Sequence, residues 1–374
     1  MSSANSFGRR FSITCFGESH GEVVGVVVDG CPAGLPLTEG DVQAELDKRR
    51  PGSTPYSTSR READRVRIVS GVFRGFTTGA PICMVVANED VDSRPYEVFR
   101  YRPRPSHADY PAAVRYGGFN DYRGGGRFSG RMTVALVAAG AVAKKLLSRL
   151  GVEVYAHVSQ VGRVAAGRQP SVEELRRVYE SPVRCAVPEV RGAMEEELRR
   201  AVEEGDSVGS MVEAYAFNVP PGLGDPIYHG LDSDLAALLF SVPGVRAVCF
   251  GSGLEAPSMR GHEFIDEYRV EGGRVVAATN RSGGIIGGLS TGSPIHVRVA
   301  FKPPSTIRRR VRTVDLRSME EVELEAYGRY DPCIGPRAVP VVEACVSIVL
   351  VDHMLNQGLI GAVLGEPGGA EEAR

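Results

Sequence analysis

The chain has 374 residues, enough for one large domain or two ordinary ones, with 43% hydrophobic and 24% charged residues. Its 44 basic residues nearly balance 46 acidic ones, and the formal net charge of -2 argues against a protein devoted to nucleic-acid binding. Seven scattered cysteines form no C-x-x-C pair and no Cys/His cluster at zinc spacing, so we expect reduced thiols and no metal site.

The N-terminal region predicts a buried strand followed by a helix. Residues 23–29 are rich in β-branched side chains and end before a glycine, as buried strands do. A helix then begins near Thr38 and ends before Pro51, which cannot continue it, so Arg49 lies at the C-terminal end of that helix. The first ten residues lack the apolar segment of a secretory signal, and we expect a cytoplasmic protein.

Two strands and a long loop come next. Segments 66–72 and 80–87 have strand composition, and the turn residues between them predict an antiparallel pair. From 88 to 130 the chain is polar, rich in arginine and punctuated by glycine, with little periodicity. A loop of that length inside a compact domain is usually functional.

The remainder predicts a core of helices and strands. Residues 132–150 are apolar and rich in alanine, which predicts a buried helix. The apolar stretch of this helix is too short to span a bilayer, so we expect no membrane association. Further helices are predicted at 232–240 and 339–356, and further strands at 152–158, 210–218, 245–250 and 295–301. No linker divides the chain, which favours a single α+β domain over 1–364 with a disordered tail at 365–374.

Two histidines lie in loop segments suited to anion chemistry. His20 stands between Ser19 and Gly21, and a glycine on each side of the S-H pair allows a tight turn close to a ligand. His107 follows Arg104 in R-P-S-H-A-D, where a guanidinium should lower the histidine pKa and attract a phosphate. A structural histidine in a turn, or a histidine on a surface loop, remains the alternative for each segment.

Glycine-rich segments supply further candidate anion sites. The run G-G-G-R-F-S-G-R at 124–131 precedes the buried helix, so its backbone N–H groups and helix dipole favour an anion, although it matches no nucleotide fingerprint. The paired glycines at 282–292 allow close approach of a backbone or a flat ring. Residues 302–306 place an ammonium and two hydroxyls on a rigid turn. A glycine hinge and tight strand packing are the alternatives for the first two segments.

The segment 328–340 places Asp331 between Arg329 and Arg337. Its glycines and prolines predict an irregular backbone rather than a helix or strand, as expected where a site holds an anion and keeps a carboxylate ionised. Together, these segments predict an anion-binding enzyme with two histidines and one aspartate at its centre.

Seven motifs in order along nearly the whole chain resemble the chorismate synthase family: G-E-S-H-G, D-K-R-R-P-G, R-P-S-H-A-D-Y, D-Y-R-G-G-G-R, S-G-G-I-I-G-G-L-S-T-G, K-P-P-S-T-I and G-R-Y-D-P-C-I-G-P-R-A-V-P. The resemblance implies a carbon-oxygen lyase that removes phosphate from 5-enolpyruvylshikimate 3-phosphate by anti-1,4-elimination to give chorismate in the shikimate pathway, with reduced FMN. It also implies a β-α-β sandwich, with helices between antiparallel sheets, and a homotetramer.

The resemblance also implies roles for individual residues. His20 would protonate or stabilise the departing phosphate, His107 would set the protonation of the reduced flavin near its N1, and Asp331 would receive the proton from N5. The implied substrate-binding residues are Ser19, Arg49, Arg104, Ser129, Arg131 and Arg329. The implied cofactor-binding residues are Arg127, Phe128, Ser129, Gly287, Lys302, Pro303, Pro304, Ser305, Thr306 and Arg329.

Three departures from the family pattern affect individual ligands rather than the reaction. Tyr330 stands where the family usually has histidine, Phe128 replaces a serine, and Pro55 stands where many members have an arginine. A flavin-dependent oxidoreductase is the nearest alternative, but the chain lacks a dinucleotide fingerprint. A non-catalytic nucleic-acid binder is a second alternative, and it gives no reason for Asp331 or the two histidines. The length leaves little room for a reductase module, so we expect NADPH to act indirectly through a separate flavin reductase.

Overall fold

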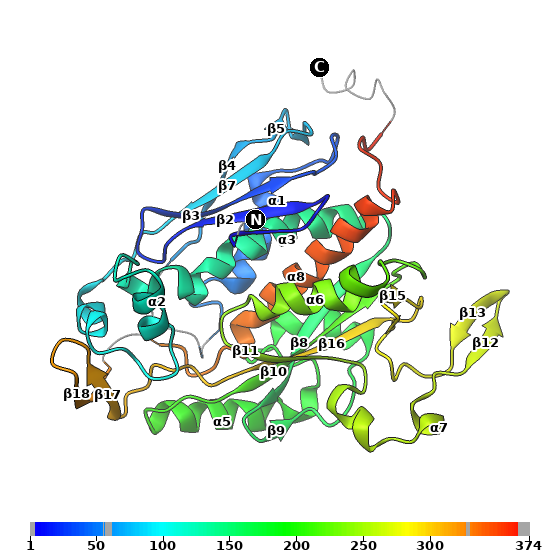
Figure 1. The fold of residues 1–374 in the computed structure, drawn as a ribbon. Coiled ribbons are helices and arrows are strands. Elements are labelled where there is room, and N and C mark those ends of the chain that lie inside the picture. The colour runs from blue at the N-terminus through cyan, green and yellow to red at the C-terminus, as the bar shows by residue number, and fades with distance from the viewer. Residues whose placement is uncertain (1–3, 55, 57–61, 327–329, 366–374) are drawn as a thin grey trace.

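Two antiparallel sheets face each other across a layer of helices in the computed structural model, which describes residues 4–54, 56, 62–326 and 330–365 (Figure 1). The first sheet has the order β1–β2–β3–β7–β4, with strands Ser6–Phe7, Ser12–Gly17, Val23–Asp29, Ile82–Ala87 and Val66–Ser70. The second has the order β11–β16–β10–β8–β9, with strands Val245–Phe250, Ile295–Phe301, Ser210–Phe217, Glu153–Val161 and Val164–Ala165. The predicted β-α-β sandwich is therefore confirmed.

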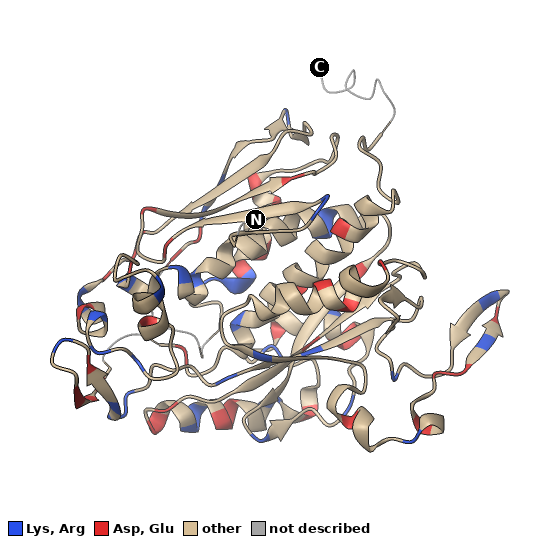
Figure 2. Ribbon diagram, in the orientation of Figure 1, with Lys and Arg blue, Asp and Glu red and all other residues tan. Residues whose placement is uncertain are grey.

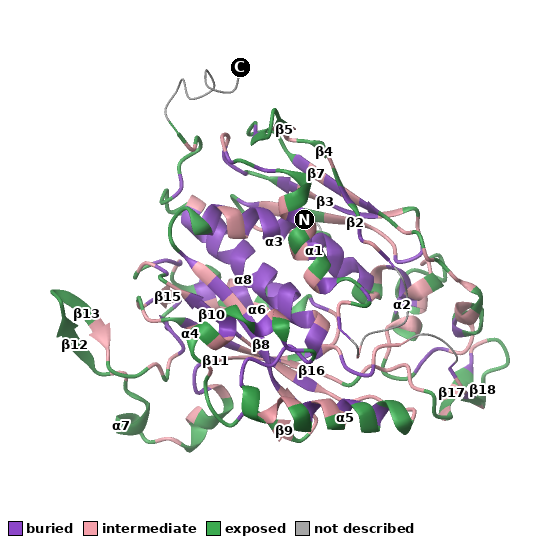
Figure 3. Cartoon of the chain, turned by 180° about the vertical axis from the view of Figure 1, so that it is seen from behind, coloured by how far each residue is buried: buried purple, intermediate pink, exposed green. Residues whose placement is uncertain are grey.

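The helical layer consists of α1 (Glu39–Arg49), α3 (Thr133–Ser148), α6 (Leu231–Phe240) and α8 (Gly335–Asn356). Figure 3 shows α3 and α8 buried along most of their length between the sheets. They approach so closely that a Cβ added at Gly140 of α3 would lie 2.3 Å from the Cβ of Ala344 in α8. A larger side chain at Gly140 would therefore force the two central helices apart.

Smaller elements surround the sandwich. Helix α5 (Arg191–Glu203) lies outside the second sheet, and the hairpin of β12 (Tyr268–Glu271) and β13 (Arg274–Ala277) projects from the body (Figure 1). The other short helices and strands are α2 (Asp109–Arg115), α4 (Val172–Arg176), α7 (Gly261–Phe264), β5 (Val72–Phe73), β6 (Phe76–Thr77), β14 (Ile285–Ile286), β15 (Leu289–Ser290), β17 (Val311–Asp315) and β18 (Glu320–Leu324). In the described ranges, short 3-10 helices span Arg94–Arg100, Arg123–Phe128, Gly130–Met132, Val178–Glu180, Pro188–Val190, Ile227–His229 and Gly253–Ser258.

Elements with a strong local pattern were predicted correctly. The strand at 23–29 and the strand at 295–301 have the predicted bounds. Helix α1 follows Thr38, whose hydroxyl accepts a hydrogen bond from the Asp41 amide while the Asp41 carboxylate accepts one from the Thr38 amide. This reciprocal capping satisfies two donors that the first turn of a helix would otherwise leave without partners.

Two predictions for irregular segments were wrong. Helix α8 begins at Gly335, so residues 335–340 are helical rather than irregular. Pro336 lies in the first turn, where the backbone N–H has no partner within the helix, so of the two prolines only Pro340 removes a backbone hydrogen bond from the helix interior. The loop predicted at 88–130 contains helix α2 as well as 3-10 turns. The tail predicted to be disordered lies outside the described residues, apart from Gly365.

Among the described residues, α8 alone is long and apolar enough to cross a membrane. However, 94% of its most apolar 18-residue window is buried inside the protein. That burial is typical of the core helix of a globular domain.

A buried ionic cluster joins three of the central helices. Lys144 of α3 lies 2.6 Å from a carboxylate oxygen of Glu45 in α1 and 2.5 Å from one of Glu343 in α8. Glu343 also accepts hydrogen bonds from the Ala156 amide at 3.1 Å and the Tyr179 hydroxyl at 3.0 Å. Burial opposes ionisation of Glu45, but Lys144 and Lys48 hold its pKa at about 2. The cluster therefore fixes the relative positions of α1, α3 and α8.

Replacing Lys144 with methionine should lower the free energy of unfolding by about 3–5 kcal/mol, because the buried Glu343 would lose its cation, whereas the partly buried Glu45 would keep its ion pair with Lys48. Denaturant unfolding at neutral pH would measure the change. The neighbouring Lys145 is a matched control, since it forms a more exposed ion pair with Asp41. Lys145→Met should cost less than about 1 kcal/mol. Equal losses in the two variants would contradict the role assigned to the cluster.

Candidate active site

A cavity of about 1060 Å³ opens at one end of the helical layer, where α1 ends and both α3 and α8 begin. The amino termini of two long helices add positive potential there. Figure 2 shows Lys and Arg on the helix ends and loops of this side. Most of the predicted site residues line the cavity: Ser19, His20, Arg49, Arg104, His107, Arg127, Phe128, Ser129, Arg131, Lys302, Pro304, Ser305, Thr306 and Asp331.

His20 packs against the glycine run at 124–126. Its Nδ1 lies 2.9 Å from the Ser93 hydroxyl, and its ring meets Tyr96 edge to face at a centroid distance of 5.1 Å. Gly124 adopts a φ of +60°, and a Cβ there would lie 2.3 Å from Cδ2 of His20. Only glycine therefore suits position 124, both for the backbone conformation and for the space that His20 occupies.

His107 forms a tight group with Asp109 and Arg104. Its Nδ1 lies 2.6 Å from Asp109 Oδ1, and the Arg104 guanidinium makes two 2.8 Å bonds to the same carboxylate. Burial lowers the pKa of His107, the hydrogen bond to Asp109 opposes this, and Arg104 lowers it further. The predicted direction is confirmed, but burial rather than the guanidinium is the main cause.

Arg49 and Arg131 share a buried carboxylate, Asp64, that none of the quoted motifs contains. Asp64 Oδ2 lies 3.0 Å from Arg49 Nη1, and Asp64 Oδ1 accepts a hydrogen bond from Arg131 Nη1. Burial opposes ionisation of Asp64, but Arg49 and Arg131 hold its pKa below the usual range. Glu62 lies 3.7 Å from Arg131 and adds a second negative charge. The only local signal was the acidic pair in R-E-A-D, directly after the loop at 51–61.

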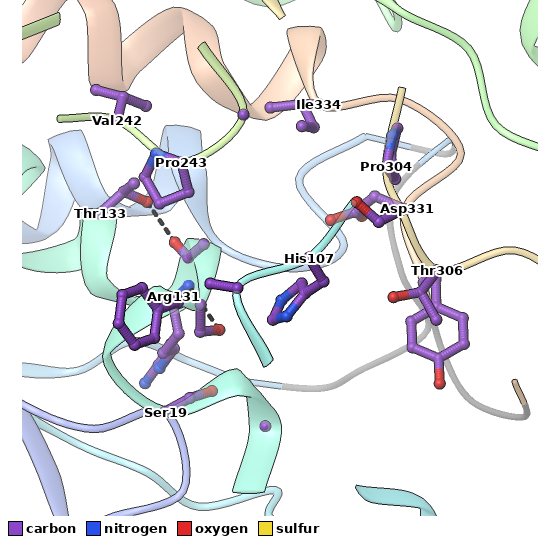
Figure 4. Close-up of a pocket in the computed structure, with 18 of the residues that line it drawn as sticks. Ser19, His107, Arg131, Thr133, Val242, Pro243, Pro304, Thr306, Asp331 and Ile334 are labelled. Carbon is purple, nitrogen blue, oxygen red and sulfur yellow. Dashed lines mark hydrogen bonds between the residues drawn. The ribbon is translucent and has the colours of Figure 1, made fainter. Parts of the chain in front are cut away.

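Asp331 lies shortly before α8, which begins at Gly335, and its carboxylate is 2.6 Å from Nη1 of Arg337. The prediction of a flanking guanidinium is thus confirmed for Arg337, whereas Arg329 lies outside the described residues. Figure 4 shows Asp331, His107 and Arg131 around the same space. Burial, with Tyr96 nearby, raises the pKa of Tyr330 to about 12, so this departure from the family pattern supplies a neutral phenol.

The turn at 302–306 closes one side of the cavity. Lys302 Nζ donates to the Ser305 hydroxyl, which in turn donates to the Ser106 carbonyl at 2.6 Å. Thr306 Oγ1 accepts a hydrogen bond from Arg104 Nη1 at 3.2 Å. These contacts tie the turn to the loop that carries His107, so a ligand gripped by the turn lies close to that histidine.

Three predicted cofactor residues are placed differently from the rest. Gly287 forms the turn of the β14–β15 hairpin and does not line the cavity, and neither does Pro303. Arg127 reaches the cavity wall, but its guanidinium donates to the carbonyls of Cys15 and Gly17 at 3.2–3.3 Å. Contacts of Gly287 and Pro303 with a cofactor therefore remain predictions.

The geometry is typical of an enzyme for a small anionic substrate, because buried guanidinium groups surround two histidines and a carboxylate inside a cavity large enough for more than one small ligand. The family model for chorismate synthase matches residues 11–355. Proteins named chorismate synthase from Aeropyrum pernix and Methanocella arvoryzae are 55% and 53% identical to this chain, covering 95% and 96% of it and 94% and 96% of their own lengths.

A crystal structure of chorismate synthase is also similar, with a TM-score of 0.74 and 27% identity, covering 96% of this chain and 95% of that one. The chain belongs to the chorismate synthase family, which confirms the resemblance inferred from its motifs. It is accordingly a carbon-oxygen lyase that acts on a small-molecule substrate, and its family uses a flavin cofactor.

Proposed function

We propose that this chain converts 5-enolpyruvylshikimate 3-phosphate to chorismate by anti-1,4-elimination of phosphate, as a cytoplasmic enzyme of the shikimate pathway that uses reduced FMN. The observation that carries the proposal is the cavity itself, in which His20, His107 and Asp331 lie among guanidinium groups. Arg49, Arg104 and Arg131 would neutralise the phosphate and carboxylates of the substrate, with the hydroxyls of Ser19 and Ser129 as donors. We extend the substrate role to Arg329 from the family motif alone.

The residues present suit a flavin mononucleotide beside the substrate. The cavity of about 1060 Å³ exceeds what a single small ligand fills. Lys302, Ser305 and Thr306 offer the ammonium and hydroxyl groups that a phosphate monoester requires, and Phe128 is a candidate contact for a flat ring. Reduced flavin, when bound, supplies electron density that permits the elimination without net redox change.

Three side chains of the protein would donate, accept or hold protons during the reaction. His20, oriented by Ser93, is the donor that we assign to the departing phosphate. Asp331, next to Arg337, is the base that we assign to the proton lost in the elimination. His107, oriented by Asp109, is the group that we assign to controlling the charge of the bound cofactor.

An anaerobic assay with 5-enolpyruvylshikimate 3-phosphate and FMN, with and without dithionite, tests the proposal. We expect chorismate absorbance and phosphate release only when the flavin is reduced. Adding NADPH in place of dithionite should give no product, because we propose that a separate reductase supplies the reduced flavin. Absence of product from a folded protein with bound flavin would refute the lyase mechanism and favour the oxidoreductase alternative.

We also propose a homotetramer, as the family resemblance implies. The projecting β12–β13 hairpin supports an assembly, since Tyr268, Val270 and Val275 on it are 64%, 75% and 68% exposed. Apolar side chains on an arm of this kind gain stability when a second subunit covers them. Sedimentation equilibrium would give the number of subunits.

A further inference from the structure

Asn88 directly follows strand β7 and contacts two parts of the cavity wall. Its Nδ2 donates a hydrogen bond to the carbonyl of Glu18 at 3.1 Å and another to the carbonyl of Gly21 at 2.8 Å. Its Oδ1 accepts a hydrogen bond from Nε of Arg131 at 2.9 Å. One half-buried amide therefore joins the turn at 18–21 to a guanidinium that lines the cavity.

The partners of Asn88 fix the orientation of its side-chain amide. The two backbone carbonyls can only accept hydrogen bonds, and the guanidinium of Arg131 can only donate them. Rotating the amide by half a turn would place its oxygen against two carbonyl oxygens and its NH2 group against a donor. Among side chains of this size, an ionised aspartate lacks the two donors and leucine lacks both donors and acceptor, so only asparagine satisfies all three partners.

The turn at 18–21 carries two of the side chains assigned to the substrate. Ser19 and His20 are both buried and both line the cavity, and Figure 4 shows Ser19 and Arg131 among the residues around it. The carbonyls that Asn88 binds belong to the first and last residues of this turn. Hydrogen bonds at both ends of so short a turn limit the positions that its two middle residues can take.

Arg131 is held at each of its guanidinium nitrogens. Nη1 donates to the Asp64 carboxylate, and Nη2 donates to the Ala87 carbonyl at 3.3 Å. Nε donates to Asn88, which follows Ala87 in the chain. These bonds fix the plane of the guanidinium, and the one to Asn88 links that plane to the turn at 18–21.

We propose that Asn88 is a positioning residue for the elimination, which sets the distance between the proton donor His20 and the anion-binding Arg131. This inference rests on the proposed function. A departing phosphate must meet the proton donor and the guanidinium at once, and a misplacement of about 1 Å in such an arrangement can lower the rate about 100-fold. Asn88 is not among the residues that line the cavity, so it acts through these two side chains.

Asn88→Asp separates the two contacts, because a carboxylate keeps an acceptor for Arg131 but has no donor for the turn. We expect kcat to fall about 10- to 100-fold while KM changes less than about threefold. Asn88→Leu removes all three hydrogen bonds, so KM should also rise, by about tenfold, as Arg131 loses its orientation. Steady-state kinetics with pre-reduced FMN would measure both constants.

Hydrogen exchange of the ligand-free protein tests the same contacts without catalysis. The amides of Ser19 and Gly21 donate to the carbonyls of Gly126 and Glu18, at 3.3 Å and 3.1 Å. Peptides that span 17–22 should exchange about tenfold faster in Asn88→Asp than in the wild type, because the turn opens more often. Peptides from the middle of α3 should exchange at the wild-type rate. Mass spectrometry would read both segments.

Gln357→Glu is the matched control. The side chain of Gln357 also donates to two backbone carbonyls, those of Gly222 at 3.2 Å and Gly224 at 2.8 Å, and it does not line the cavity. The variant therefore loses the same kind of bonds away from the site, and it should keep the kcat and KM of the wild type. An equal loss of kcat in this control would overturn the positioning role.

The other outcomes divide in the same way. Wild-type kcat in Asn88→Asp, or unchanged exchange at 17–22, would overturn the inference. A rise in KM without a fall in kcat would restrict Asn88 to the support of Arg131 and would overturn its link to His20. A wild-type protein that forms no chorismate with reduced FMN would instead refute the proposed function, while the exchange measurement would still test the contact between Asn88 and the turn.

Discussion

Replacing Asp331 with asparagine should lower kcat by about two to four orders of magnitude, the usual contribution of a general acid or base. Asparagine cannot take up a proton, but its amide oxygen can still accept the 2.6 Å hydrogen bond from Arg337. Substrate affinity should therefore change only a few-fold. Single-turnover formation of chorismate with pre-reduced flavin would measure the chemical step separately from binding.

A loss of kcat in Asp331→Asn indicates a missing base only if the rest of the cavity is unchanged. Arg337→Gln is its companion, since it leaves the carboxylate in place and removes only the neighbouring guanidinium. We expect a smaller loss of kcat in that variant, because Asp331 can still act as a base. If Asp331→Asn retains activity within about tenfold of the wild type, Asp331 is not the proton acceptor, and the remaining candidates are the two histidines.

Replacing Asp64 with asparagine should lower the free energy of unfolding by about 3–5 kcal/mol and kcat/KM by about 100-fold. The change removes the carboxylate charge that the buried Arg49 and Arg131 share, and we expect both guanidinium groups to leave their present positions. Asp64 has a φ of +48°, a conformation that asparagine also tolerates, so the variant tests the charge rather than the backbone. Denaturant unfolding and steady-state kinetics would measure the two effects.

The pH dependence distinguishes an electrostatic role for Asp64 from a packing role. The folded-state pKa of Asp64 is lowered, so its ionised form contributes stability above the unfolded pKa of about 4. That contribution is lost as the pH falls through the folded-state value. The stability difference between wild type and Asp64→Asn should therefore be largest at neutral pH and shrink below about pH 4. A difference that is independent of pH would contradict the electrostatic account.

Asp47→Asn is the matched control for the Asp64 variant. Asp47 faces Arg50 at 3.5 Å in an ion pair with both side chains nearly half exposed. Solvent screens such a pair, and its loss should cost less than about 1 kcal/mol with no effect on kcat/KM. A large effect of this control would show that charge changes on α1 disturb the site indirectly.

Local chemistry explains which elements were predictable. The β-branched run at 23–29 and the capping signal at Thr38 act over a few residues, and the structure has both elements as expected. The start of α8 was missed because prolines usually end helices, whereas Pro336 lies where the helix needs no donor. Helix α2 has too few residues to show a hydrophobic period.

The candidate site shows the same division between local and long-range information. The motifs contain most of the side chains that line the cavity, and His107 with Asp109 are neighbours within one motif. Asp64 lies between Arg49 and Arg131 only after the chain folds, and Arg246 enters the cavity through a bulge in strand pairing. The acidic pair in R-E-A-D is the one local signal for Asp64, and no local pattern marks Arg246.

The amino-acid sequence by itself therefore determined the family, the layered fold and the set of polar groups available for chemistry. Only the tertiary structure decided which guanidinium groups are neutralised by carboxylates and which remain for ligands. The physical reason is that the interaction energy of two charges depends on the distance between them and on their burial. Packing brings Asp64 next to Arg131, and strand pairing brings Arg246 next to Lys302, although both pairs are far apart in the chain.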